Sequence, residues 1–243
     1  MSAEVRLSVV IPAYNEESRL PGTLAEVCSF LAGQPYDSEV IVVDDGSTDG
    51  TMRAVRECCT HGFLRLIQHE DRANHGKGAA VRLGMMEARG IYRIFMDADN
   101  STTIDQIEAF WPWFDRGYDI VLGSRKAKGA KVKVRQSWYK ELAGRLGNHL
   151  IQALAVPGIS DTQAGFKMFT GAAANALFER QTIDGWGYDI ELLTIARLLG
   201  YRIREVPIVW INSEGSKVQL HSYIQVLNDI RRIRRNLRNR RYL

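Results

Sequence analysis

The chain has 243 residues, of which 45% are hydrophobic, 25% charged and 9% aromatic. This is an ordinary globular composition, and it excludes intrinsic disorder, a collagen-like repeat and a disulfide-rich scaffold. Three cysteines, two of them adjacent, form neither a disulfide framework nor a Cys-x-x-Cys metal motif. No run approaches about 18 apolar residues, and the first six residues are too polar for a signal peptide, so we expect a cytoplasmic protein.

The net charge of +4 is unevenly distributed along the chain. Residues 125–141 and residues 229–243 each contain seven basic residues and one acidic residue. The rest of the chain is therefore acidic overall. Two basic segments on an acidic body suggest an anionic partner, such as nucleic acid, a lipid headgroup surface or a phosphorylated substrate.

Short apolar runs alternate with helical patterns through the first half of the chain. The runs predict strands at residues 7–11, 40–43, 64–67, 91–96 and 120–122. The apolar spacing between them predicts helices at residues 16–31, from a cap at Ser47 or Thr48 to about residue 59, at 76–89 and at 104–114. This alternation predicts an α/β fold with a mostly parallel sheet flanked by helices.

The second half of the chain is less regular. Its patterns predict helices at residues 135–156, 172–178 and 189–199 and strands at 166–169 and 203–210. A basic amphipathic helix is expected over residues 223–240, with one apolar stripe made of Ile224, Leu227, Ile230, Ile233 and Leu237. We expect residues 1–220 to form one domain, to which residues 221–243 add a C-terminal helix that is not a separate domain.

Polar side chains follow four of the predicted strands, at the point where each strand ends. They lie in segments 12–16, 44–47, 97–99 and 123–125. Open α/β sheets bind their ligands at the carboxyl ends of the strands. The sequence therefore predicts a site at this edge of the sheet.

Asp97 and Asp99 are separated by one small residue, directly after a predicted buried strand. Two such carboxylates can face a divalent cation, because Mg²⁺ and Mn²⁺ prefer oxygen ligands and share them with substrate phosphates. The alternative is a solvated turn in which Asp99 caps the next helix, since a single Asp-x-Asp is common. The charged groups at the other strand ends favour the metal.

Other charged side chains could bind a nucleoside, its phosphates and a second phosphate group. Asp44 and Asp45 can accept hydrogen bonds from ribose hydroxyls or a base N–H, or can form a tight turn and a helix cap. Lys77 opens a predicted helix and can meet phosphate, although its segment is neither a Walker A loop nor a full dinucleotide fingerprint. Arg125 and Arg135 suit bidentate contact with phosphate, while the lysines between them fit a solvated basic loop.

Several motifs, in their usual order, resemble the family 2 glycosyltransferases of the GT-A fold. They are SVVIPAYNEE at 8–17, VVDDGSTDGT at 42–51, NHGKGAAV at 74–81 and DAD at 97–99. The resemblance narrows to the polyprenyl-phosphate sugar synthases, in particular the dolichyl-phosphate β-glucosyltransferase type, through GSR at 123–125, DTQAGFKMF at 161–169, YDIELL at 188–193 and EGSK at 214–217. It covers roughly residues 7–223.

The resemblance implies an inverting transfer of a hexose from a nucleotide sugar, with UDP-glucose as first choice, to a polyprenyl or dolichyl phosphate. It implies Mg²⁺ or Mn²⁺ bound by Asp97 and Asp99. The mannose synthases of the family have a glutamine metal ligand where this chain has Ser101. The nucleotide contacts that it implies are Pro12, Tyr14, Glu16, Asp44 and Lys77, and Asp45 is a neighbouring candidate.

The same resemblance implies that Arg125 and Arg135 contact the acceptor phosphate. Arg125 would then place the acceptor oxygen for in-line attack on the anomeric carbon. Gln163, Lys167 and Lys217 stand in matching motifs and are further substrate-binding candidates.

A phosphate acceptor is already an anion and needs little help from a general base. Asp161 and Asp189 are therefore explained equally well as ion-pair or capping residues.

The sequence leaves alternative functions open, which differ in the sugar donor, in the acceptor or in whether the protein is an enzyme. UDP-GalNAc, UDP-GlcNAc or GDP-mannose are alternative donors for the same lipid, and a transferase acting on a glycan hydroxyl is a second kind of enzyme. A binding module that uses the basic tail, for a nucleotide sugar or for nucleic acid, is a third possibility. Acidic strand ends would repel a nucleic-acid backbone, so we expect no nucleic-acid partner.

A lipid product predicts a peripheral location on the cytoplasmic face of a membrane. The C-terminal helix could lie on anionic headgroups with its apolar stripe turned inward. It could instead dock on a small membrane-protein partner. The alternative is a helix that packs on its own domain and leaves a basic edge exposed.

Overall fold

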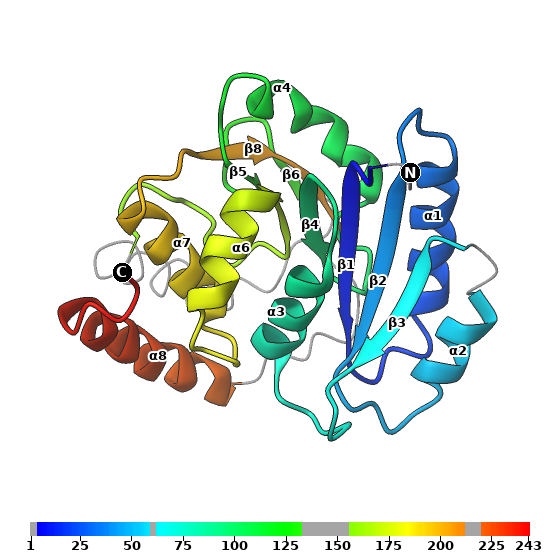
Figure 1. Ribbon diagram of the computed structural model, residues 1–243, viewed down its shortest axis with the longest axis horizontal. Coiled ribbons are helices and arrows are strands. Elements are labelled where there is room, and N and C mark those ends of the chain that lie inside the picture. The colour runs from blue at the N-terminus through cyan, green and yellow to red at the C-terminus, as the bar shows by residue number, and fades with distance from the viewer. Residues whose placement is uncertain (1–3, 59–61, 133–155, 212–219) are drawn as a thin grey trace.

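The computed structural model describes residues 4–58, 62–132, 156–211 and 220–243. These residues form an α/β structure around a seven-stranded sheet with the order β3-β2-β1-β4-β7-β5-β8 (Figure 1). The strands are β1 Leu7–Ala13, β2 Ser38–Asp44, β3 Leu64–Gln68, β4 Tyr92–Met96, β5 Ile120–Ser124, β7 Phe166–Thr170 and β8 Ile203–Pro207. The mostly parallel sheet that the strand–helix alternation predicts is confirmed.

Helices cover both faces of this sheet. They are α1 Leu20–Ala32, α2 Thr51–Cys58, the 3₁₀ helix η1 Ile104–Ala109, α4 Trp111–Phe114, α3 Lys77–Glu87, α6 Gly171–Arg180, α7 Tyr188–Leu198 and α8 Leu220–Arg238. Side chains of the first four belong to one apolar cluster and those of the last four to another. Alternate residues of one strand serve the two clusters, as the period of two requires: Val9 faces one and Val10 the other.

The central strands are buried on both faces, which explains their continuous apolar sequence. β1 pairs in parallel with both β2 and β4. Helix α3 packs directly on β1 and β2 because Gly84 has no side chain: a Cβ there would collide with Val10 and come within 2.7 Å of Val43. This packing fixes the height of the first turn of α3 above the sheet.

Strand β7 runs antiparallel to both of its neighbours, β4 and β5. The sequence predicts the strand at residues 166–169 but not its direction. Met96 at the end of β4 pairs with Phe166 at the start of β7. The segment that precedes β7 therefore lies beside the segment that follows β4, and the two motifs they carry come together.

Several predicted elements have different boundaries in the structure. Helix α2 begins at Thr51, so neither Ser47 nor Thr48 is the residue directly before it. The helix predicted from residue 16 begins at Leu20, after a turn in which Glu16 O accepts hydrogen bonds from the backbone N–H groups of Arg19 and Leu20, three and four residues later. The helix predicted over 104–114 is split into η1 and α4, because Pro112 has no N–H to continue a helix and stands in the first turn of α4.

The strand predicted over 203–210 is likewise two strands, β8 and the short β9 Val209–Trp210. β9 pairs in parallel with β6 Lys131–Val132, so this part of the basic segment forms a strand and not a loop. The helix predicted at 135–156 lies outside the described residues except for its last residue.

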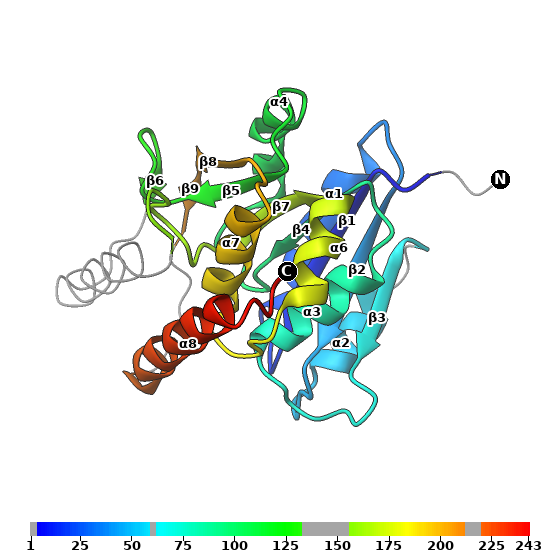
Figure 2. The ribbon, with the colours of Figure 1, turned by 60° about the vertical axis from the view of Figure 1, so that its left-hand side comes forward.

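Helix α8 packs along α7 at the outer side of the molecule (Figure 2). Ile230 and Ile233 of the predicted apolar stripe are buried in the domain core, while Leu227 is 41% exposed and the side chain of Ile224 lies outside the described residues. Most of the described stripe is thus used for packing. Of the alternatives that the sequence leaves open, the described part of the stripe fits the one in which the helix packs on its own domain.

Beyond α8, Tyr242 is fully buried, and its hydroxyl donates a hydrogen bond of 2.6 Å to Glu191 Oε1 of α7. This anchors the C-terminal turn to the domain. Among the helices of the described residues, none is both long enough and apolar enough to cross a membrane.

Candidate active site

The carboxyl ends of the parallel strands β1, β2 and β4 meet at one edge of the sheet, toward the bottom of Figure 1. Pro12 lies in β1 itself and is partly buried, while Tyr14 follows it and is 39% exposed. The expected site residues are therefore brought to one edge by the parallel pairing. The local contacts decide what each can do.

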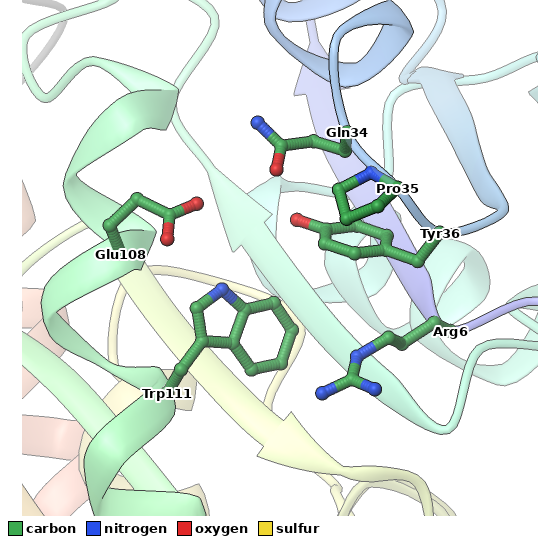
Figure 3. Close-up of a pocket in the computed structure, with 6 residues that line it drawn as sticks. All are labelled: Arg6, Gln34, Pro35, Tyr36, Glu108 and Trp111. Atoms are coloured by element: carbon green, nitrogen blue, oxygen red, sulfur yellow. The ribbon is translucent and has the colours of Figure 1, made fainter.

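A hollow of about 340 Å³ lies elsewhere, near the start of β1 (Figure 3). The guanidinium of Arg6 lies there 5.2 Å from the ring centre of Trp111 and 5.7 Å from that of Tyr36. This is a cation–π stack. None of the predicted site residues lines the hollow.

The two carboxylate oxygens of Asp44 differ in their contacts. Oδ2 accepts hydrogen bonds from Gln68 Nε2 at 2.8 Å and from the Ser47 N–H at 3.3 Å. Oδ1 is buried, and within the described residues it has no hydrogen-bond partner. An unpaired buried acceptor is costly, so this oxygen is suited to a ligand N–H or O–H.

Asp45 has a different environment from its neighbour. Its two oxygens accept hydrogen bonds, each 2.9 Å long, from the backbone N–H groups of His75 and Gly76. Burial nevertheless raises the pKa of Asp45. The carboxylate fixes the backbone that leads into α3, and contact with substrate stays a prediction for this residue.

Lys77 is the first residue of α3, and its Nζ lies 2.5 Å from Asp97 Oδ1. Burial disfavours its charge, but the carboxylates of Asp97 and Asp189 outweigh this and raise the pKa of Lys77. Its ammonium also lies 5.7 Å from the ring centre of Trp186. The structure thus places a permanent cation beside the first aspartate of the DAD motif.

Asp97 and Asp99 follow β4, and both side chains are partly exposed. The backbone of Gly165 passes so close to Asp97 that any Cβ at residue 165 would overlap the carboxylate. Asp99 Oδ1 accepts a hydrogen bond from the Ser101 N–H at 3.0 Å. The described residues contain no cluster of three or more His, Cys, Asp or Glu side chains placed to hold a metal.

A buried ion pair lies behind Asp97. Lys167 of β7 is completely buried, and its Nζ donates to Asp189 Oδ1 of α7 at 2.6 Å and to the carbonyl of Ala164. Burial raises the pKa of Asp189, and the charges of Lys167 and Lys77 only partly offset this. Lys167 is therefore engaged by buried groups of the protein, and its contact with substrate stays a prediction.

Arg125 follows β5 and is held by Asp161. Its Nε and Nη2 donate to the two oxygens of that carboxylate at 2.8 and 2.7 Å. Burial opposes both charges, but the paired groups lower the pKa of Asp161 and raise that of Arg125. The guanidinium also stacks 5.4 Å from the ring centre of Trp210. Its orientation is therefore fixed by two groups, the Asp161 carboxylate and the Trp210 ring.

Comparison with known proteins identifies the family of this chain. The sequence profile described as glycosyl transferase family 2 matches residues 8–178. The chain belongs to this family. It is 38% identical over 244 residues to the dolichyl-phosphate beta-glucosyltransferase of Drosophila melanogaster, covering 94% of this chain and 74% of that protein. It is 36% identical over 243 residues to the enzyme of the same name from Homo sapiens, covering 94% and 75%.

A solved structure also resembles this glycosyltransferase. It is glucosyl-3-phosphoglycerate synthase from Mycobacterium tuberculosis in complex with Mn²⁺, UDP and phosphoglyceric acid, with a TM-score of 0.66 and 22% sequence identity. The likeness covers 94% of this chain and 78% of that one. The expected GT-A fold is confirmed.

Two further site residues expected from the sequence, Glu16 and Gln163, have partners of their own within the chain. Glu16 is buried and paired with Arg19 at 2.6 Å. Gln163 is exposed and donates a long hydrogen bond of 3.4 Å to the carbonyl of Trp186. Arg135 and Lys217 lie outside the described residues, so their contacts with substrate stay predictions.

Sequence reasoning missed Gln68 and Trp186. Gln68 pairs in register with Asp44 across β2 and β3, so its position at the end of a predicted strand was a usable signal. Trp186 lies beside Lys77 only through the packing of segment 183–188, and no local pattern reveals that contact.

Proposed function

We propose that this chain transfers glucose from UDP-glucose to dolichyl phosphate or a related polyprenyl phosphate, giving the lipid-linked sugar and UDP. The observation that carries the proposal is the pairing of Asp97 with Lys77 at the sheet edge, with the fixed Arg125 in the same charge network. The two curated relatives named above carry the corresponding activity in their names.

The donor side is supported by Asp44 and Lys77. The unpaired Oδ1 of Asp44 suits the ring N–H of a uracil. Lys77 stands at the N-terminus of α3, where the helix dipole also favours phosphate. A diphosphate there would take over the ammonium that now pairs with Asp97.

Asp97 and Asp99 fit a divalent cation that is shared with the donor. They supply carboxylate oxygens next to the diphosphate-binding lysine, and the donor would supply the remaining ligands. When bound, Mn²⁺ or Mg²⁺ stabilises the charge that develops on the leaving diphosphate. The Mycobacterium tuberculosis synthase holds Mn²⁺ together with UDP, which favours the same pairing here.

The acceptor side is supported by Arg125. Within the described part of the chain, Nε and Nη2 of the guanidinium donate to Asp161. We propose that Nη1 donates to a phosphate oxygen of the acceptor. Trp210 and Asp161 hold the group rigid, and a rigid cation positions an attacking oxygen better than a mobile one. Arg135 and Lys217 are proposed as further acceptor contacts.

The chemistry is a single displacement. A phosphate oxygen of the acceptor forms a bond to the anomeric carbon as the bond from that carbon to the UDP oxygen breaks, so the anomeric centre inverts. No proton has to leave the acceptor. Asp189, engaged by the buried Lys167, is consistent with a reaction that needs no strong general base.

We propose that the protein works as a peripheral protein at the cytoplasmic face of a membrane. The described end of the chain exposes arginines on α8 and just after it, namely Arg231, Arg232, Arg234, Arg235, Arg238, Arg240 and Arg241. Each contributes about 1 kcal/mol near an anionic leaflet. Binding through charge alone fits a helix whose apolar stripe is largely buried, and an acidic membrane-protein partner is the alternative.

A donor screen tests the proposed function. The protein is incubated with Mn²⁺, dolichyl phosphate and each radiolabelled UDP-glucose, UDP-GlcNAc, UDP-GalNAc or GDP-mannose, and label in the organic phase is counted. We expect label from UDP-glucose that is lost with EDTA and in Asp99→Asn. If label entered only a soluble glycan, the assignment of a lipid acceptor would be wrong. If label entered the lipid from a donor other than UDP-glucose, the assignment of glucose as the transferred sugar would be wrong.

A further inference from the structure

Asp44, which the proposed function places against the donor base, has one occupied and one unoccupied carboxylate oxygen. Asp44 Oδ2 already accepts two hydrogen bonds, from Gln68 Nε2 and from the Ser47 N–H. A carboxylate oxygen has two lone pairs, so Oδ2 has no further capacity. Within the described residues Oδ1 has no partner, so Asp44 offers a ligand a single acceptor atom.

Nucleobases differ in what they present to such a group. Uracil has one ring N–H, flanked by two carbonyl oxygens. Guanine has a ring N–H beside an amino group, and this pair of donors matches both oxygens of an open carboxylate. A carboxylate with one oxygen occupied fits the uracil edge and leaves a donor of guanine unpaired, which is a strong source of discrimination.

We propose that Gln68 is a specificity-determining residue, which selects uridine over guanosine nucleotides by occupying Oδ2 of Asp44. The inference rests on the proposed function, because it assumes that Asp44 binds the donor base. Gln68 is well placed for this role, since it ends β3 directly opposite Asp44 at the end of β2.

The geometry also fixes the amide of Gln68. Its Nε2 lies 3.2 Å from Met52 Sδ as well as 2.8 Å from Asp44 Oδ2, so contacts on two sides orient it. Asp44 is 1% exposed, and a base reaches Oδ1 only by displacing atoms that cover it. Once water is excluded, an unpaired donor on the wrong base cannot be satisfied by solvent.

Titration calorimetry with UDP and with GDP, each with Mn²⁺, tests the proposal. We expect the wild type to bind UDP more tightly than GDP. In Gln68→Leu the ratio of the two affinities should fall at least tenfold, because UDP loses an oriented acceptor and GDP gains a second one. Gln68→Glu, which replaces the donor by an acceptor, should lower the ratio at least as far.

Gln34→Leu is the matched control, because Gln34 is also partly buried and donates to a backbone carbonyl away from the site. It should leave both affinities unchanged. If folded Gln68→Leu and Gln68→Glu have the same ratio of UDP to GDP affinity as the wild type, the inference is overturned. The proposed function survives that result if Asp44→Asn weakens UDP binding. A wild type that binds neither nucleotide overturns both.

Discussion

The buried pair of Lys167 and Asp189 gives the sharpest test of the energetics behind the site. Lys167→Met keeps much of the apolar stem but leaves Asp189, 5% exposed, without its ion-pair partner. Removing one member of a buried pair costs about 3–5 kcal/mol of unfolding free energy. At about 2–4 °C per kcal/mol for a chain of this size, the melting temperature should fall by roughly 6–20 °C.

The pH dependence of the unfolding free energy shows whether the unpaired charge of Asp189 causes the loss. Burial already raises the pKa of Asp189, and removing Lys167 removes the main influence that lowers it. A carboxyl whose folded pKa exceeds its unfolded pKa favours the folded state as it is protonated. The deficit of Lys167→Met should therefore shrink as the pH falls from 7 toward 5.

Urea unfolding of the wild type, Lys167→Met and the double variant Lys167→Met/Asp189→Asn measures these free energies. Asp189→Asn removes the stranded charge, so the double variant should recover at least half of the loss. A loss below about 1 kcal/mol in the single variant, or a double variant as unstable as the single one, would refute the reasoning.

Three further predictions concern the acceptor, the metal and the C-terminal turn. Asp161→Asn frees the guanidinium of Arg125 to move, so the KM for dolichyl phosphate should rise about 10- to 100-fold while the KM for UDP-glucose changes little; equal changes in both would argue against an acceptor role. UDP should tighten Mn²⁺ binding at least about tenfold, measured by electron paramagnetic resonance, and identical affinities with and without UDP would exclude a shared cation. Tyr242→Phe removes the hydroxyl that donates to Glu191, and thermal unfolding should show a loss of about 1–2 kcal/mol; an unchanged melting temperature would contradict this.

The position of the site could be predicted from the sequence because parallel strands share one direction. Once the alternation of strands and helices was recognised, Asp44, Asp97 and Arg125 had to lie at strand ends on one edge. The resemblance of several motifs to those of family 2 glycosyltransferases then indicated the family. These inferences need only local patterns and one rule of topology.

The contacts that define the chemistry could not be predicted in the same way. The antiparallel direction of β7 brings Gly165 against Asp97, and nothing local to residues 166–169 encodes that direction. Lys167 appeared as a substrate contact, whereas the structure buries it against Asp189. Such pairings depend on tertiary packing between segments far apart in the chain.

The C-terminal helix shows the same limit. Its stripe and its arginines are plain in the sequence, but an amphipathic helix can turn its apolar face to lipid or to its own domain. Ile230 and Ile233 face their own domain, where they are buried in the apolar core. The arginines that remain outside are then the part available to a membrane.

The stereochemistry of the product tests the central claim most directly. Protein, Mn²⁺, dolichyl phosphate and UDP-α-glucose are incubated, and the anomeric configuration of the lipid-linked sugar is read by nuclear magnetic resonance. A single displacement by the acceptor phosphate predicts β-glucosyl phosphate. An α-linked product would contradict the single displacement, and the absence of any lipid-linked glucose would contradict the assignment of the acceptor.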